Sequence, residues 1–368
     1  MNILRVASDL YPAVVGGIGI HVHELSKWQV KYGHHVTVFT NGRKNFKKQE
    51  LIDGYQVRRF PVRFNFFGNS ISPDLIPALI RSKGQFDIIH AHSHLFFSTN
   101  VCTLNHLLDS TPLIVTNHGL ISASAPEWLN QIYKKTITKI TFDIADCILC
   151  YTEIEKKNIE KLGINTKKIR VVHNGVDTTL FAPQLNKKEN SFQQLLWIGR
   201  FVYGKRVDLL IDAYNKTLKE YPNTRLTLVG EGPLKESIDN KIEKLGLKKN
   251  IQIINRIDNS DLPALYNQAD IFILPSLMES IPRTLLESMS CGIPVIVTDL
   301  PHLVNLVKDA GLFIPRENIS VLSKQIARLL QDKEFALRLG NHGREIIEKQ
   351  YSWQDTVQQT LNVYQEFV

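Results

Sequence analysis

The sequence predicts an α/β protein of two domains, each built around a parallel sheet. Its 368 residues are enough for two domains of ordinary size. Short apolar runs alternate with helical stretches along the chain, which is typical of βαβ units. The pattern restarts after residues 181–191, a polar stretch with a proline that suits an exposed link. We therefore expect one domain at 1–180 and a second at 192–352.

The individual elements follow from the spacing of apolar residues and from helix start and stop signals. In the first half we expect a helix at 17–32 and strands near 2–7, 35–40, 55–62, 87–91 and 113–117. In the second half we expect helices near 205–220 and 233–245, and strands at 194–199, 225–229, 251–254, 269–275 and 293–297.

Composition indicates a soluble globular protein, with 43% hydrophobic and 22% charged residues. No apolar run is long enough to span a bilayer and no leader opens the chain, so a cytoplasmic location is expected. Four cysteines argue against a disulfide scaffold. Cys147 and Cys150 form a lone C-x-x-C, which would suit a redox or metal site, but their apolar neighbours favour two thiols in a buried strand.

Two glutamates, Glu279 and Glu287, are separated by seven residues within the run 275–297. A strand precedes Glu279, Pro282 suits the first position of a helix that contains Glu287, and Gly292 is a natural helix stop. Ligands of open parallel sheets bind at the carboxyl ends of the strands, where Glu279 would lie. The alternative is a solvated helix face. The complete strand, helix and glycine frame favours a site.

This run resembles the E-x7-E signature of the retaining glycosyltransferases of family 4, which have the GT-B architecture. Similar motifs occur in the family's order over almost the whole chain, at 11–21, 33–40, 87–92, 116–119, 174–177 and 199–205. The resemblance implies two Rossmann-like domains facing across a cleft. It also implies a C-terminal helix, about 353–368, that crosses back to the N-terminal domain.

Such an enzyme must stabilise the diphosphate that leaves when the sugar is transferred from its nucleotide. Arg200 offers a planar fork for phosphate oxygens and Lys205 a point charge, although most such residues are surface cations. Gly16 and Gly17, at a helix start, would let the backbone approach the diphosphate or the sugar. The glycines of 16–19 do not match G-x-G-x-x-G, which disfavours an NAD enzyme.

The remaining roles are implied by the resemblance alone. Glu287 would bind the ribose hydroxyls, Glu279 would contact the transferred sugar, and His118 would face that sugar. Nucleobase contacts would come from the region of Arg256 and Ile257. The implied reaction is hexosyl transfer (EC 2.4) from a UDP- or GDP-sugar, with retention, to a hydroxyl of a lipid-linked or envelope glycan.

The loop after the first glutamate departs from the family pattern. The family usually has Phe-Gly where this chain has Ile281 and Pro282, and proline lacks an amide donor. Arg283, the first of Arg283, Thr284 and Leu285 in this loop, would either restore the charge or face solvent.

No metal or other cofactor is expected, because the chain contains no Asp-x-Asp that could hold a divalent cation. The charges of Arg200 and Lys205 would replace it. His90, His92 and His94 alternate along an extended segment, so they could share one face as metal ligands. No carboxylate accompanies them, and a metal is disfavoured there.

The formal net charge of +8 is concentrated between residues 41 and 63. The cations expected to face a partner are Arg58, Arg59 and Arg63, followed at once by Phe64, Phe66 and Phe67. Cations beside exposed aromatics suit an anionic bilayer, which would make the protein peripheral on the inner face of the membrane. The alternative is a strand with a basic outer face and buried phenylalanines. Nucleic acid is disfavoured, since no binding motif accompanies the charge.

Two other functions share this architecture or family. A sugar-nucleotide epimerase is disfavoured by the two glutamates together with Arg200 and Lys205. A non-catalytic subunit of a transferase complex would be expected to have lost those residues, and all four are present.

Overall fold

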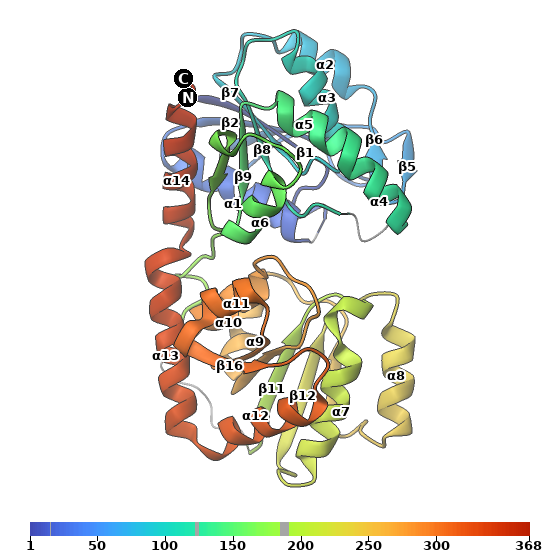
Figure 1. Cartoon of the computed structure of the whole chain (residues 1–368), viewed down its shortest axis with the longest axis vertical. Coiled ribbons are helices and arrows are strands. Elements are labelled where there is room, and N and C mark those ends of the chain that lie inside the picture. Colours follow the sequence, from blue (N-terminus) through green and yellow to red (C-terminus); the bar gives the residue numbers. More distant parts are fainter. Residues whose placement is uncertain (15, 122–124, 185–190) are drawn as a thin grey trace. The chain divides into compact units, whose positions relative to one another are not determined.

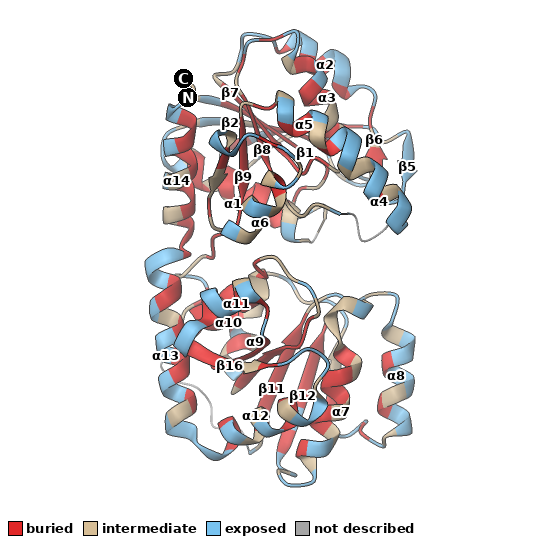
Figure 2. Cartoon of the chain, viewed as in Figure 1, coloured by how far each residue is buried: buried red, intermediate tan, exposed pale blue. Residues whose placement is uncertain are grey.

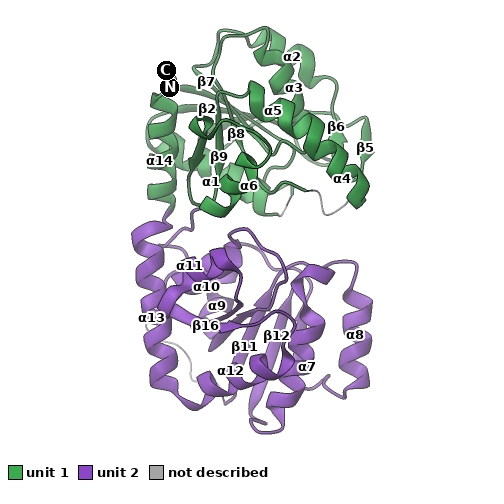
Figure 3. Ribbon diagram, in the orientation of Figure 1, with its two compact units in different colours: residues 1–174, 353–368 green, residues 175–352 purple. Residues whose placement is uncertain are grey.

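The computed structural model describes residues 1–14, 16–121, 125–184 and 191–368 (Figure 1). The chain divides into two compact units (Figure 3). Unit 1 holds residues 1–174 and 353–368, and unit 2 holds residues 175–352. The expected link at 181–191 therefore lies inside unit 2, and its residues 185–190 are outside the described residues.

Unit 1 is built on an eight-stranded sheet with the order β10-β9-β8-β7-β1-β2-β4-β3. Its strands pair in parallel except β3 and β4, which are antiparallel. The strands are β1 Asn2–Ala7, β2 His35–Asn41, β3 Gln49–Ile52, β4 Tyr55–Phe60, β7 Ile88–His92, β8 Leu113–Thr116, β9 Cys147–Cys150 and β10 Ile169–Val171. A separate antiparallel hairpin consists of β5 Phe64–Phe66 and β6 Asn69–Ile71.

Helices cover both faces of this sheet, because successive strand residues point to opposite sides. Ile3 of β1 packs in one apolar cluster and its neighbour Leu4 packs in the other. The helices of unit 1 are α1 Gly17–Lys31, α2 Leu75–Arg81, α3 Phe97–His106, α4 Glu127–Tyr133, the π-helix η1 Lys134–Thr138, α5 Lys139–Ile144, α6 Glu153–Glu160, the 3-10 turn η2 Thr166–Lys168 and α14 Trp353–Gln365. Buried strands between exposed helix faces are visible in Figure 2.

The C-terminal helix α14 belongs to unit 1, and a buried hydrogen-bond network ties it to the sheet. The Tyr364 hydroxyl lies 2.5 Å from His90 Nδ1 and accepts a 3.3 Å bond from Arg5. Arg5 is fully buried and also donates to Ser26 and Gln29, each at 2.7 Å. Burial lowers the pKa of Arg5. The hydrogen bonds that Arg5 donates to these partners offset the cost of burying its charge.

Cys147 and Cys150 both lie in β9, fully buried and not in a disulfide. Burial raises the pKa of each thiol to about 12. The prediction of two thiols in a buried strand is confirmed.

Unit 2 has a six-stranded parallel sheet with the order β13-β12-β11-β14-β15-β16. The strands are β11 Gln193–Ile198, β12 Thr224–Val229, β13 Ile251–Ile254, β14 Ile271–Leu274, β15 Val295–Thr298 and β16 Gly311–Ile314. The helices are η3 Tyr203–Lys205, α7 Val207–Leu218, α8 Lys235–Lys244, α9 Leu262–Gln268, α10 Arg283–Ser290, α11 Pro301–Val307, η4 Lys308–Ala310, α12 Ile319–Gln331 and α13 Lys333–Gln350.

The order of unit 2 is that of a dinucleotide-binding Rossmann sheet, and it reverses between β11 and β14. The parallel sheets predicted for both halves of the chain are confirmed. Pro282 forms the N-cap of α10, and Gly292, with φ of +72°, follows its end as expected. None of the helices in the described residues is both long enough and apolar enough to cross a membrane.

We predict that Tyr364→Phe lowers the free energy of unfolding by about 1–3 kcal/mol, because buried donors and acceptors on Arg5 and His90 lose a partner. Urea unfolding would measure this. Tyr203→Phe is the matched control, since Tyr203 is 68% exposed. Equal stability losses in the two variants would contradict a structural role for the buried hydroxyl.

Candidate functional site

The loops after β11 and β14 lie side by side in unit 2, because these two strands are neighbours in the sheet. The backbone N–H of Leu277 donates to the carbonyl of Gly204 at 2.8 Å and joins the loops. Across this joint the Lys205 ammonium forms an ion pair with the Glu279 carboxylate. Their side chains are only 24% and 9% exposed, so the pair is partly sheltered from water. Lys205 and Glu279, which are 74 residues apart in the chain, therefore meet at one point.

Arg200 follows β11 on the same edge of the sheet. Its side chain is exposed and makes no hydrogen bond or ion pair with the other described residues. Because Glu279 balances the charge of Lys205, Arg200 supplies the uncompensated positive charge of these loops. Arg200 and Lys205, the cations predicted to bind phosphate, therefore lie on one edge of the sheet, but only Lys205 is paired with a carboxylate.

Glu287 is buried inside α10, with 1% of the residue exposed. One carboxylate oxygen accepts a bond of 2.8 Å from the Tyr266 hydroxyl, and the other accepts from Arg283, whose Nε lies 2.9 Å away. Burial and the adjacent carboxylate raise the pKa of Tyr266 well above its usual range. A carboxylate has about four lone-pair positions, so Glu287 retains some capacity for a further donor.

Arg283 does not face solvent and is already paired with a carboxylate. Its side chain is 14% exposed and paired with Glu287 one helical turn away, and its Nη2 donates to Asn259 at 3.0 Å. The nearby Leu285 is fully buried and Thr284 is half-buried, so Leu285 contributes packing alone. Arg283 therefore ties the start of α10 to Asn259 and to the buried Glu287.

Arg256 and Ile257 lie in the loop after β13, which is separated from β11 by one strand. Arg256 is exposed and Ile257 is half-buried. Their position at the carboxyl end of the sheet agrees with the sequence expectation, and their contact with a nucleobase stays a prediction.

In unit 1, Gly16 is the N-cap of α1 and Gly17 is its first residue, with no side-chain cap. A Cβ atom on either glycine would meet nothing within 4 Å, and neither has a positive φ. Packing in unit 1 therefore does not require these two glycines, which leaves room for a ligand to approach the free N–H groups of the helix start.

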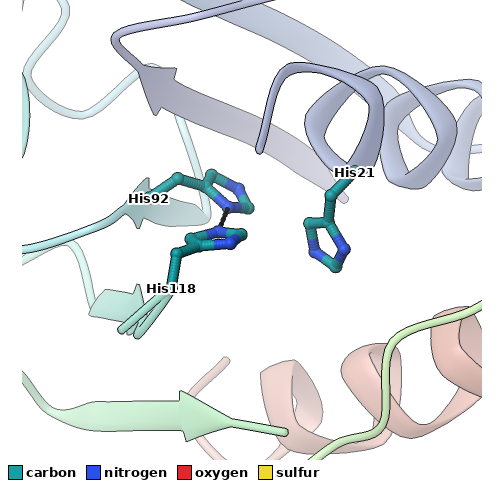
Figure 4. A group of neighbouring side chains, drawn as sticks. All are labelled: His21, His92 and His118. Carbon is teal, nitrogen blue, oxygen red and sulfur yellow. Dashed lines mark hydrogen bonds between the residues drawn. The ribbon is translucent and has the colours of Figure 1, made fainter. Parts of the chain in front are cut away.

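His118 follows β8, and both of its ring nitrogens are hydrogen-bonded. Nδ1 lies 2.9 Å from the Tyr151 hydroxyl, and Nε2 lies 3.1 Å from His92 Nδ1 (Figure 4). Burial lowers the pKa of His118 well below its usual range, so the ring is neutral at pH 7. The residue predicted to face the donor sugar thus has a fixed ring orientation.

The three alternating histidines do not form one ligand set. His90 is bonded through both nitrogens, to Tyr364 and Thr116, whereas His94 packs against Phe142. His92 instead lies beside His118 and His21, with one nitrogen of each ring within 4.8 Å of the others. His21 was missed by the sequence analysis. Its place in the first turns of the helix after β1 is the signal that would have found it.

The prediction that Arg59 faces a partner is wrong. Its side chain is 1% exposed, paired with Glu50 and bonded to the Lys47 carbonyl at 2.9 Å. The reason is β3, an antiparallel strand that places Glu50 beside β4. Arg58 is half-buried, with its guanidinium near the ring of Phe60.

Arg63 does face solvent, with 61% of its side chain exposed. Phe64, Phe66 and Phe67 are 59%, 59% and 55% exposed, so the alternative of buried phenylalanines is wrong. The expected combination of basic and aromatic side chains is present, but on the β5–β6 hairpin and not on β4.

Two family profiles match the chain almost from end to end. Residues 15–180 match the family described as Glycosyltransferase Family 4, and residues 178–346 match Glycosyl transferases group 1. The chain belongs to glycosyltransferase family 4. It is an enzyme of the glycosyltransferase class, as the resemblance implied.

Curated relatives are similar over almost the whole chain. An uncharacterised glycosyltransferase of Methanocaldococcus jannaschii is 24% identical over 99% of this chain and 98% of its own. Glycogen synthase of Mycobacterium tuberculosis is 24% identical over 99% and 94%. A phosphatidylinositol N-acetylglucosaminyltransferase subunit of Schizosaccharomyces pombe is 23% identical over 98% and 79%.

Solved structures show the same fold. Sucrose-phosphate synthase of Thermosynechococcus elongatus has a TM-score of 0.82 at 21% identity and covers 100% of this chain and 99% of its own. Anabaena HepE in complex with UDP-glucose has a TM-score of 0.81 at 17% identity, with full coverage of both chains. The predicted GT-B fold is confirmed.

We predict that Arg283→Leu destabilises unit 2 by about 3 kcal/mol, because it leaves the buried Glu287 carboxylate without its cation. Adding Glu287→Gln should restore most of the loss. The control is Arg338→Leu, which breaks an i,i+4 pair with Glu334 whose side chains are 66% and 93% exposed, and should change stability by less than about 0.5 kcal/mol. Urea unfolding that ranks the two single variants equally would contradict the buried pairing.

Proposed function

We propose that this glycosyltransferase moves a hexose, with retention of anomeric configuration, from a UDP- or GDP-sugar to a hydroxyl of a lipid-linked or envelope glycan. The observation that carries the proposal is the meeting of Lys205 and Glu279 beside Arg200, where the strand order of unit 2 reverses. Ligands of open parallel sheets bind at such reversal points. Anabaena HepE, which shares the fold, is in complex with UDP-glucose, and this favours UDP over GDP as the nucleotide of the donor.

The three side chains suit different parts of a nucleotide sugar. Arg200 would take the phosphate oxygens through its planar fork, and Lys205 would neutralise charge that develops as the diphosphate leaves. Glu279, held by Lys205, would accept hydrogen bonds from sugar hydroxyls. The departing phosphate would then take the proton of the attacking acceptor hydroxyl, on the face from which it leaves. The roles of Glu287 at the ribose and of Gly16, Gly17 and His118 at the donor remain those implied by the family.

A thermal-shift series with UDP, GDP and ADP tests the donor. A nucleotide present at 100 times its dissociation constant stabilises the protein by about 2.7 kcal/mol. Stabilisation by UDP or GDP but not by ADP is expected. No response to any of the three would contradict a nucleotide-sugar donor.

We predict that Arg200→Ala and Lys205→Ala each weaken UDP binding about tenfold or more, because a charge-assisted phosphate contact contributes roughly 1.5–3 kcal/mol. Calorimetric titration would measure both. Lys248→Ala is the control, since Lys248 is 65% exposed and paired with Glu243 elsewhere in unit 2. Wild-type affinity for UDP in the first two variants would refute the phosphate assignment.

Transfer should persist in excess EDTA, because the positive charge at the leaving group comes from Arg200 and Lys205. The measurement is the initial rate of nucleotide release with and without chelator. A complete loss of rate that added Mn²⁺ restores would overturn metal independence.

For the acceptor side, the exposed groups of unit 1 support docking on an anionic bilayer. The aromatic surface consists of Phe64, Phe66 and Phe67 on the β5–β6 hairpin together with Trp128 on α4, which is 64% exposed. The aliphatic Ile132, one turn further along α4, is 54% exposed. Both parts are anchored to residues 94–97, at the start of α3. Asn69 of β6 accepts from Phe97 N at 2.9 Å, and Tyr133 of α4 donates to the His94 carbonyl at 3.3 Å.

Cations adjoin this aromatic surface. Arg63 precedes the hairpin, and Lys134 and Lys135 follow α4 directly. Aromatic rings suit the interfacial region of a bilayer, and each basic residue near an anionic surface contributes about 1 kcal/mol. This charge and apolar pattern favours a lipid surface over a soluble glycan as the place where the acceptor is met.

We predict that replacing Phe64, Phe66 and Trp128 together by serine releases the protein from phosphatidylglycerol-containing liposomes. Raising the salt concentration should weaken wild-type binding, because screening shortens the reach of the cations. Replacing exposed Leu337 of α13, 61% exposed in unit 2, by serine is the control. Equal sedimentation of the triple variant and the wild type with liposomes at low salt would contradict membrane binding by the aromatic surface.

The same assays test two alternative functions. Conversion of UDP-sugar without any acceptor would indicate an epimerase, which the family membership disfavours. The Schizosaccharomyces pombe relative is named as a subunit, so a role within a transferase complex is the second alternative. Donor binding without transfer by the purified chain, restored by a partner protein, would support it.

A further inference from the structure

Three histidine side chains from neighbouring strand ends converge in unit 1 (Figure 4). His21 lies in α1 after β1, His92 ends β7, and His118 follows β8, and these strands are adjacent in the order β8-β7-β1. One nitrogen of each ring lies within 4.8 Å of the other two. The topology of the sheet, and not sequence spacing, brings the three imidazoles together.

The separation of the His92 and His118 rings suits a small tetrahedral cation. Zinc binds imidazole nitrogens at 2.0–2.1 Å, so two ligand nitrogens on a tetrahedron lie about 3.4 Å apart. His92 Nδ1 and His118 Nε2 are 3.1 Å apart. A metal ion would replace the single proton that these two nitrogens share, with little movement of either ring.

Second-sphere partners already orient two of the rings. His21 Nδ1 lies 2.9 Å from Asn174 Oδ1, and an amide oxygen can only accept, so Nδ1 carries the proton and Nε2 keeps the lone pair. His118 Nδ1 lies 2.9 Å from the Tyr151 hydroxyl. Metal-binding histidines typically use their second nitrogen in this way.

The three rings differ in their access to solvent. His21 and His92 are 4% and 0% exposed, whereas His118 is half-buried and gives the cluster its access to solvent.

We propose that His21, His92 and His118 form a binding site for Zn²⁺, with the fourth position taken by water. The site shares His118 with the predicted donor contact, whereas the proposed transfer reaction itself needs no metal. His90, stacked on His92 at 4.3 Å, is not a ligand, because both of its nitrogens are hydrogen-bonded.

One feature of His92 limits the affinity. When Nδ1 binds the metal, the ring proton must sit on Nε2, which is buried without a hydrogen-bond partner among the described residues. An unpaired buried donor weakens binding by roughly ten- to a hundredfold relative to a fully supported three-histidine site. The expected site is therefore reversible, and a strong chelator should empty it.

Titration of the full chain with Zn²⁺ against a chelating dye tests the proposal. One saturable equivalent is expected, and His21→Gln and His118→Gln should each weaken it about a hundredfold or more. Tyr151→Phe, which keeps all three ligands but removes an orienting hydroxyl, should weaken it about tenfold. The control is His342→Gln on α13, whose side chain is 47% exposed and which should bind as the wild type does.

Thermal melting of each variant without metal shows whether it is folded. Substituting Co²⁺ in the unaltered protein keeps the test decisive if a variant fails to fold, because tetrahedral nitrogen ligation gives intense visible bands. Absence of those bands, absence of saturable Zn²⁺ binding, or unchanged binding in both folded ligand variants would overturn the proposal. These readouts do not involve sugar transfer, so their failure is distinguishable from failure of the proposed function.

Discussion

The ion pair between Lys205 and Glu279 is the constraint on which the candidate donor site depends. It joins the loops after β11 and β14, where the strand order of unit 2 reverses, and the backbone bond from Leu277 to Gly204 reinforces the same joint. Because the pair is partly sheltered, either charge alone would be costly to leave unpaired. The pairing also decides the local charge: Glu279 balances Lys205, and the exposed Arg200 provides the net attraction for a diphosphate.

The two units gather polar side chains at strand ends in different ways. Unit 2 uses charged pairs, Lys205 with Glu279 and Arg283 with Glu287, and keeps Arg200 exposed. Unit 1 uses neutral imidazoles, held neutral by burial, that bond to one another and to tyrosine hydroxyls. A charged edge suits an anionic ligand, and a cluster of neutral nitrogens suits a soft cation.

Much of this arrangement could be predicted from the sequence, and two of the three failures, at Arg59 and His21, share one cause. Apolar periodicity and the flanking glycines were sufficient for the main strands and for placing Glu279 on a loop and Glu287 in a helix. The pairing of Arg283 with Glu287 was not predicted, although its i,i+4 spacing was visible. Arg59 was misplaced because β3 was missed, and His21 was missed because strand order brings it to His118. Contacts that depend on which strands lie side by side in the sheet cannot be predicted from local sequence patterns.

The most direct test of the central claim is the affinity of Glu279→Gln for UDP, measured by calorimetry beside its rate of sugar transfer. If Glu279 serves the sugar while its charge compensates Lys205, removing that charge frees the ammonium for phosphate. UDP should then bind as tightly as to the wild type or up to about fivefold more tightly, since a freed charge near the surface contributes roughly 1 kcal/mol. Transfer should fall sharply. Loss of UDP binding together with loss of transfer would contradict this division of roles, and unchanged transfer would contradict the site itself.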